Sequence, residues 1–205
     1  MPLPMFPLET VLFPHARLPL QVFEHRYQIL VERCLEGDRE FGVVLIERGS
    51  EVGGGDVRSS LGTVARITEV TPLPEGRLRL ETVGTRRVRV TRWLEDDPHP
   101  RADVETIVEP AAVPEDHELR DRAERRLREI LGEVARRAGE ELPPFELHPD
   151  PEVASHQAAA LTPSGPLDAQ RLLAAETHGE RLRGVLETLD DLEELLRLAD
   201  DDAEG

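Results

Sequence analysis

The spacing of apolar residues changes once along this chain of 205 residues, close to residues 109–114. Before that point short apolar runs alternate with polar residues, as in β-strands, and after it apolar residues recur every third or fourth position, as in α-helices. Because strands come first and helices second, we expect an α+β fold with an antiparallel sheet and a separate helical layer, and not a doubly wound parallel sheet. Pro110 and Pro114 mark the linker, so we predict domains at 1–109 and 110–205.

The first half carries seven strand patterns. They cover residues 11–13, 18–22, 41–47, 62–70, 77–83, 88–93 and 102–107. The run 41–47 is almost entirely apolar, which predicts a strand covered on both faces, whereas 77–83 alternates, with Leu78 and Leu80 inward and arginines outward. Gly84 follows and predicts that the chain reverses there into a hairpin. Many short strands with glycine and proline turns are typical of a small closed or nearly closed barrel.

One helix interrupts the strands. Apolar residues within 23–35 fall on one helical face, and Gly37 follows where a left-handed C-cap glycine would stand. Cys34 lies on that face, so we interpret it as a buried core residue and not as a reactive thiol. Glu24 and Arg26 have two interpretations, a recognition pair or an arginine that ties the helix to the barrel.

The second half is predicted to be helical over 115–138, 153–161, 167–176 and from Thr177 onward. Thr177 and Glu180 match a capping box at the start of the last helix. That helix also has apolar residues at alternating spacings of three and four, namely Leu182, Val185, Leu189, Leu192, Leu196 and Ala199. This heptad seam favours packing inside its own bundle, with packing against another chain as the alternative.

Charge limits the chemistry open to this chain. All 25 basic residues are arginines, and 42 acidic residues bring the net charge to −17. Without lysine there is no Walker A motif, no Schiff base and no Ser–Lys dyad. The acidity is concentrated in the second half, which carries −13 against −4 for residues 1–109. Such a charge repels polyanions over about 10 Å at ordinary salt, which disfavours nucleic acid as a partner.

One segment of this acidic chain is strongly basic. Between Arg77 and Arg92 there are six arginines and a single acid, Glu81. Three interpretations stay open: pairing with acids of the helical half, binding of an acidic or extended peptide, and gripping of nucleic-acid phosphates. The third lacks aromatic residues among the arginines for base stacking. The candidate partner-binding residues are Arg77, Arg79, Arg86, Arg87 and Arg89.

No residue pattern for catalysis or metal binding stands out. The seven histidines include no H-E-x-x-H pair, and one cysteine is too few for a four-ligand zinc site. The acidic turn 95–97 lacks the spacing of a calcium loop, and the glycines 53–55 open no phosphate-binding helix, so we interpret them as a flexible lip. We therefore expect no catalytic residue, metal or cofactor. A hydrolase built from distant residues is a third hypothesis, without a nucleophile–base pair to name.

The sequence also predicts a location. No apolar run reaches the roughly 18 residues that a membrane-spanning helix needs. The N-terminus has neither the basic region nor the cleavage site of a secretory signal. A lone cysteine forms no internal disulfide, which fits a reducing compartment. We therefore expect a cytoplasmic protein without a membrane partner.

A series of short motifs follows in order along residues 3–108. They are L-P-M-F-P-L at 3–8, V-L-F-P at 11–14, L-P-L at 18–20, F-E-H-R-Y at 23–27, D-R-E-F-G-V-V-L-I at 38–46, G-T-V-A-R-I at 62–67 and G-T-R-R-V-R-V at 84–90. Together they resemble the N-terminal, substrate-binding domain of Lon proteases. The helical half, including L-D-A-Q-R-L-L at 167–173 and E-R-L at 180–182, resembles the helices that follow in that family.

The resemblance implies a PUA-like β pseudo-barrel followed by an α-helical bundle. It also implies a non-enzymatic bacterial module that recognises polypeptide or protein partners; the alternative is an RNA- or DNA-binding PUA-like module that uses the arginine segment. Two departures from the family stand out. His15 replaces a common glycine, and the chain reaches Gly205 without the ATPase and protease modules of full Lon proteases. We therefore expect a stand-alone recognition domain.

Overall fold

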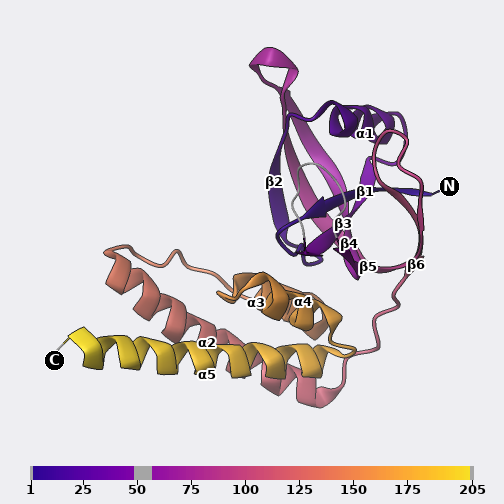
Figure 1. Cartoon of the computed structure of the whole chain (residues 1–205). Coiled ribbons are helices and arrows are strands. Elements are labelled where there is room, and N and C mark those ends of the chain that lie inside the picture. Colours follow the sequence, from indigo (N-terminus) through magenta and orange to yellow (C-terminus); the bar gives the residue numbers. More distant parts are fainter. Residues whose placement is uncertain (1, 49–56, 204–205) are drawn as a thin grey trace. The chain divides into compact units, whose positions relative to one another are not determined.

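The computed structural model describes residues 2–48 and 57–203, and the chain divides into two compact units, Met1–Val108 and Glu109–Gly205 (Figure 1). The sequence analysis places the boundary one residue later. The predicted lip at 53–55 lies outside the described residues. The first unit holds a β-sheet and one α-helix, and the second holds helices, so the fold is α+β.

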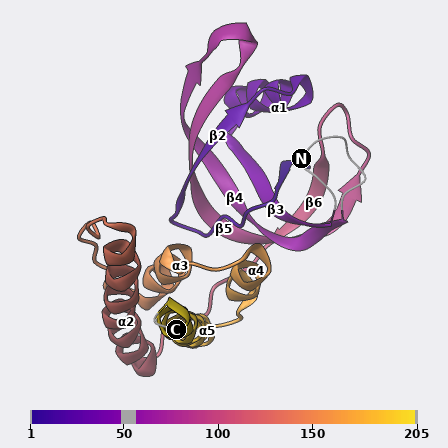
Figure 2. The same cartoon turned by 60° about the vertical axis from the view of Figure 1, so that its left-hand side comes forward.

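The first unit, called here the β unit, is built on six strands that form a ring-like sheet (Figure 2). The strands are β1 (Leu3–Leu8), β2 (Arg17–Val22), β3 (Glu40–Arg48), β4 (Val57–Pro72), β5 (Leu78–Leu94) and β6 (Arg101–Thr106). Their order is β2-β5-β4-β3-β1-β6, and β6 also pairs with β5. All pairs are antiparallel except β1 with β3. The long strands β4 and β5 therefore form the centre of the ring-like sheet, and β2 pairs with β5 at one edge of it.

The predicted hairpin around Gly84 is wrong, because β5 runs unbroken from Leu78 to Leu94. The turn that precedes β5 is the 3-10 helix η1 (Pro74–Gly76). Gly84 lies inside the strand and pairs with Ala65. A Cβ atom there would lie 2.2 Å from the carbonyl oxygen of Phe13, so the glycine permits close backbone packing and not a reversal.

Two further strand predictions differ from the structure. Residues 11–13 form no strand. Among the described residues, the Leu12 carbonyl oxygen accepts a hydrogen bond from the Thr63 hydroxyl at 2.5 Å and not from the backbone of a neighbouring strand. Conversely, β1 was not expected, because Pro4 and Pro7 break the strand pattern. It nevertheless pairs in parallel with β3, where Pro7 lies opposite Val44.

The core of the β unit lies on both sides of β3. Phe41 and Val43 belong to a large apolar cluster, and Val44 belongs to a smaller one with Met5. All of these side chains are at most 2% exposed. The prediction that this strand is covered on both faces is therefore confirmed.

Helix α1 (His25–Glu36) contributes Tyr27, Leu30, Val31 and Cys34 to the larger cluster. The Cys34 thiol donates to the Glu40 carbonyl oxygen at 3.2 Å, and burial raises the pKa of the thiol to about 12. The interpretation of Cys34 as a core residue is thus confirmed. Gly37, however, has a φ of −118°, so the predicted left-handed cap is wrong; the positive φ falls on Arg39 instead.

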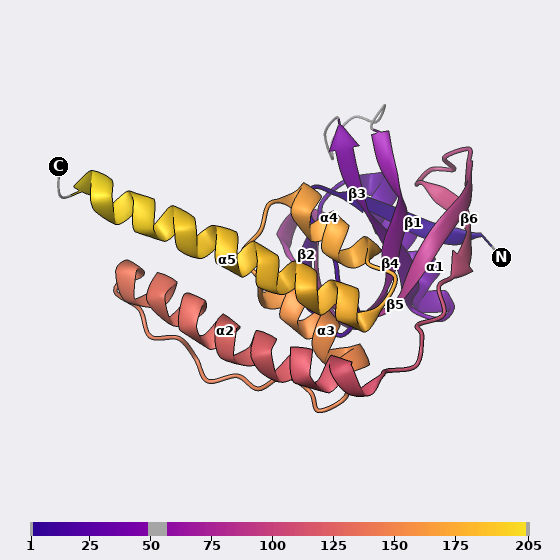
Figure 3. The same ribbon diagram turned by 90° about the horizontal axis from the view of Figure 1, so that it is seen from below.

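The second unit, called here the helical unit, contains α2 (Pro114–Ala138), α3 (Pro151–Leu161), α4 (Pro166–Ala174) and α5 (His178–Ala203). The long helices α2 and α5 run side by side and in the same direction (Figure 3). The predicted capping box is present, with the Glu180 N–H donating to the Thr177 hydroxyl at 3.1 Å. Among the described residues, no helix is long and apolar enough to cross a bilayer.

The apolar seam in the N-terminal half of α5 packs inside the helical bundle. Leu182, Val185 and Leu189 are fully buried. Toward the C-terminal end the seam opens, and Leu192 and Leu196 are only half-buried. The prediction of packing within the bundle is therefore confirmed for the first half of α5.

A buried arginine ties the helical unit together. Arg181 has no exposed surface, and its guanidinium donates to the Leu172 carbonyl oxygen at 3.2 Å, the Ser155 hydroxyl at 2.9 Å and the Ala175 carbonyl oxygen at 3.0 Å. The Glu109 carboxylate lies 3.8 Å from it. One side chain on α5 thus connects α3, the end of α4 and the first residue of the unit.

Candidate functional site

The β unit has an apolar groove, called here the β2 groove, between β1, β2 and the start of α1. Its volume is about 270 Å³. The lining residues are Phe6, Leu8, Thr10, Leu18, Pro19, Leu20, Gln21, Val22, Phe23, Glu24 and Tyr27. Eight of these eleven side chains are apolar, so the groove offers contact surface and few polar groups.

Strand β2 forms one wall of the groove and lies at an edge of the sheet. Among the described strands it pairs with β5 alone, so its other edge has no strand partner. Arg17, Pro19 and Gln21 are exposed, whereas Leu18 and Leu20 are half-buried and pack against the core. Pro19 has no N–H group, which is tolerated at an edge strand and not in the middle of a sheet.

Aromatic rings form the floor and the rim. The ring of Phe6 stacks on Tyr27, with centroids 4.0 Å apart and an angle of 7° between the planes. Phe23, just before α1, is 60% exposed, which is high for a phenylalanine. It belongs to the predicted apolar face of the 23–35 segment, yet it precedes the helix and lies at the groove rim.

The only charged group in the lining is neutralised locally. The Arg26 Nε donates to the Glu24 carboxylate at 3.0 Å, and the guanidinium lies 4.6 Å from the centre of the Tyr27 ring. The pair therefore covers one end of the aromatic floor. These contacts give Arg26 a structural role at the rim and leave the groove without net charge.

Three of the motifs that carry the family resemblance meet at this groove. Residues 3–8, 18–20 and 23–27 supply most of its lining, from β1, β2 and the start of α1. These residues were not predicted as a site. The signal in the sequence was the prolines, which interrupt the strand pattern.

The five candidate arginines do not form one surface. Arg77 follows η1, and the other four lie on β5, where the segment 77–89 spans about 40 Å of extended chain. Arg87 is only 2% exposed, so this predicted partner-binding side chain is buried within the β unit. Arg79 and Arg86 form ion pairs with Glu81 and Glu40, at 3.1 and 2.8 Å.

The ion pairs of Arg79 and Arg86 lie within the β unit itself. Glu40 accepts from both Arg86 and Arg66. Burial alone would raise the pKa of the Glu40 carboxyl, but the two guanidinium groups outweigh burial and lower it. Because the arginines are spread out and partly paired, the arrangement gives no support to the nucleic-acid alternative.

No metal site emerges in the part of the chain that the structure describes. No three His, Cys, Asp or Glu side chains there are grouped so as to hold an ion. The buried His99 is bonded to its surroundings, with an Arg33 guanidinium nitrogen 3.3 Å from its Nε2. Burial, above all, lowers the pKa of His99. Its environment is that of a core histidine.

A family model described as the ATP-dependent protease La (LON) substrate-binding domain matches residues 2–191. The Lon protease of Dictyoglomus thermophilum is 36% identical over 108 residues, which are 52% of this chain and 14% of that protein. The chain thus aligns with only a small part of that relative.

Two solved structures are similar to both units. A Lon N-terminal domain protein from Xanthomonas campestris matches with a TM-score of 0.67 and 29% identity, over 91% of this chain and 98% of that chain. The N-terminal domain of the Mycobacterium avium complex Lon protease matches with a TM-score of 0.66, over 93% and 99% of the two chains. At 18% identity, the second match shows the fold alone.

Proposed function

Because this chain belongs to the family of the ATP-dependent protease La (LON) substrate-binding domain, we propose that it is a non-enzymatic module that binds polypeptide segments of protein partners. The observation that carries this proposal is the β2 groove, an uncharged apolar hollow beside an open strand edge. Such a surface fits apolar side chains of an extended chain. Its one carboxylate, Glu24, is paired with Arg26, so it offers contact and no reacting group.

The proposed mode of binding follows from strand β2, which forms the wall of the groove, and from Phe23 at its rim. An extended segment lies along β2 and inserts apolar side chains between Leu18, Leu20 and Phe23. Pro19 removes one backbone donor from β2, which limits main-chain pairing. Side-chain contact therefore supplies most of the affinity. This mode accepts many sequences, as a module for unfolded segments requires.

We propose that the protein is located in the cytoplasm. The lone Cys34 is a reduced, buried thiol, which is compatible with a reducing compartment. A bacterial cytoplasm also supplies unfolded polypeptides as ligands.

The test measures binding of a fluorescent, permanently unfolded apolar polypeptide by anisotropy. Phe23→Ser removes the exposed ring at the rim, and we expect binding to weaken about fivefold to tenfold. The matched control is Val57→Ser, which changes another exposed apolar residue of the β unit outside the groove. Absence of saturable binding by the unmodified protein, or equal losses in both variants, contradicts the proposal.

A further inference from the structure

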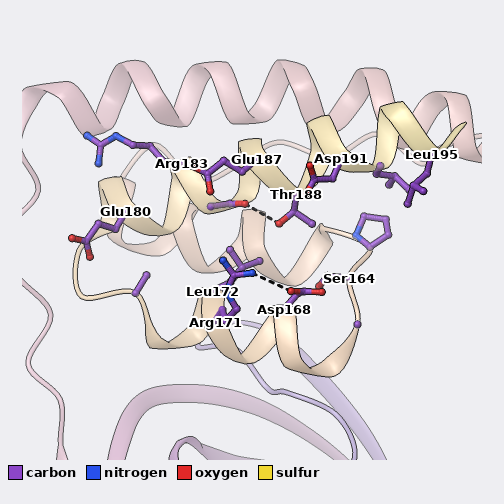
Figure 4. Close-up of a pocket in the computed structure, with 15 residues that line it drawn as sticks. Ser164, Asp168, Arg171, Leu172, Glu180, Arg183, Glu187, Thr188, Asp191 and Leu195 are labelled. Atoms are coloured by element: carbon purple, nitrogen blue, oxygen red, sulfur yellow. Dashed lines mark hydrogen bonds and ion pairs between the residues drawn. The ribbon is translucent and has the colours of Figure 1, made fainter. Parts of the chain in front are cut away.

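The helical unit has a second, larger hollow between α4 and α5, called here the α4–α5 groove (Figure 4). Its volume is about 650 Å³. Glu187, Thr188, Asp191 and Leu195 line it from α5, and Asp168 and Leu172 line it from α4. The proposed polypeptide-binding function uses residues of the β unit alone, so this groove is unexplained by it.

Helices α4 and α5 approach each other closely at Gly184. At Gly184 a Cβ atom would lie 2.8 Å from the Leu172 side chain, so the glycine lets α4 approach α5 closely. Helix α4 has nine residues and α5 has twenty-six. Beyond α4, Leu195 and Leu198 are 63% and 55% exposed. Three residues apart, they lie on neighbouring parts of one helix face. This part of α5 thus presents leucines without a helix over them.

The acids of α5 separate into two sets. On the side of α2, Asp190 and Glu193 form ion pairs with Arg126, at 3.0 and 2.6 Å. On the groove side, Glu187 and Asp191 are exposed and, within the described residues, form no ion pair. They stand one helical turn apart on the groove wall (Figure 4). The two acids on the side of α2 are thus paired with an arginine, and Glu187 and Asp191 are not.

The remaining charged groups of the groove do not neutralise these two acids. Arg171 is paired with Asp168 across one turn of α4, at 3.3 Å. Glu180 accepts backbone N–H groups at the start of α5, and Arg183, one turn before Glu187, forms no ion pair with it within the described residues. The end of the groove near Leu195 therefore combines apolar surface with negative charge.

This combination selects one kind of occupant. A second copy of the chain is unfavourable, because residues 187–200 of α5 contain six acids and one arginine, and two such helices repel each other. We propose that the α4–α5 groove docks a basic amphipathic helix of a partner protein. Its apolar stripe lies on Leu192 and Leu195, and its arginines or lysines pair with Glu187 and Asp191.

The test uses the full chain and a synthetic helical peptide of about 14 residues, which spans about 21 Å. The peptide carries leucines at helical spacing and lysines beside them. A matched peptide keeps the leucines and replaces every lysine by glutamate. We expect saturable binding of the lysine peptide, weaker at high salt, and at least about tenfold weaker binding of the glutamate peptide. Equal binding of the two peptides overturns the proposal.

Variants locate the binding. The double variant Glu187→Lys with Asp191→Lys is expected to bind the lysine peptide at least about tenfold more weakly than the unmodified protein. The control with the same change in net charge is Glu141→Lys with Glu146→Lys, at two exposed positions outside the groove. Equal losses in the two double variants would show general attraction to an acidic protein and overturn the proposal.

A pair of leucines tests the apolar contact. Leu195 and Leu167 are both 63% exposed, but only Leu195 lines the groove. We expect Leu195→Ser to weaken binding of the lysine peptide about fivefold and Leu167→Ser to leave that binding unchanged. The reverse order, or no change in either, overturns the proposal. Binding of the unfolded polypeptide at the β2 groove is unaffected by all these variants, so the two proposals fail separately.

Discussion

The two units of this protein place charge differently, although each buries one arginine, Arg87 in the β unit and Arg181 in the helical unit. The β unit keeps an apolar interior around β3, and its candidate groove is uncharged. The helical unit instead buries Arg181 completely and surrounds it with carbonyl oxygens, a hydroxyl and the Glu109 carboxylate. The core around β3 is therefore held by the removal of apolar surface from water, whereas the helical unit depends in addition on the contacts of the buried Arg181. This difference determines which substitutions each unit tolerates.

The largest expected effect comes from removing the buried charge. Arg181→Ala removes the guanidinium group from Glu109 and from three hydrogen-bond acceptors, and we expect the helical unit to lose about 3–5 kcal/mol of unfolding free energy. Urea unfolding followed by circular dichroism measures this loss. Arg197→Ala, at a side chain that is 71% exposed, is the control and is expected to change stability by less than about 0.5 kcal/mol.

The same variant separates the two units. Cys34 is 4% exposed in the β unit, so thiol labelling in urea reports the opening of that unit. We expect Arg181→Ala to lower the urea concentration at which helical signal is lost and to leave the labelling of Cys34 unchanged. Simultaneous shifts of both signals would show that the two units unfold as one.

Two glycines sharpen the comparison. At Gly84 a Cβ would meet the backbone oxygen of Phe13 at 2.2 Å, and at Gly184 it would meet the mobile end of Leu172 at 2.8 Å. Gly84→Ala is therefore expected to cost the β unit about 1–3 kcal/mol. In Gly184→Ala, the strain is offset by a helix propensity gain of about 1 kcal/mol, so little change is expected. Thermal unfolding of both variants checks this, and equal costs would contradict it.

The smallest effect concerns the surface charge of the β unit. Glu40 has a lowered pKa in the folded state, so its ion pairs stabilise the fold above the ordinary carboxyl pKa of about 4.3. That stability is lost as the pH falls through the folded pKa. Glu40→Gln is expected to cost about 1 kcal/mol at pH 7, since the side chains of Arg66 and Arg86 are 57% and 40% exposed, and less at low pH.

Denaturation with urea at several pH values, followed by Cys34 labelling, measures the difference between the unmodified chain and Glu40→Gln. Glu32→Gln, at an exposed position of α1, is the control. A difference that stays constant down to low pH would show that ionisation of Glu40 does not stabilise the β unit.

The sequence predicted the features that depend on local pattern. The change from period two to period three or four gave the α+β class, and Thr177 with Glu180 marked the start of α5. It failed where distant residues decide. Gly84 has the appearance of a turn, but its role depends on Phe13, which lies far away in the sequence. The burial of Arg87 and Arg181 depends equally on partners that no local pattern reveals.

The candidate sites show the same limit. The arginine segment attracted attention because its charge contrasts with the rest of the chain, but the structure spreads it along one strand. The β2 groove has no such contrast in the sequence, because Leu18, Leu20 and Phe23 are ordinary core residues by type. Only the fold shows that Phe23 is exposed beside an open edge.

Pro19 has a consequence for the protein in a crowded solution. An open strand next to an exposed phenylalanine and half-buried leucines is a template on which copies can stack into fibrils. A proline in the middle of β2 interrupts the regular ladder that such stacking requires. Pro19 thereby discourages aggregation between copies of this protein while the β2 groove stays open.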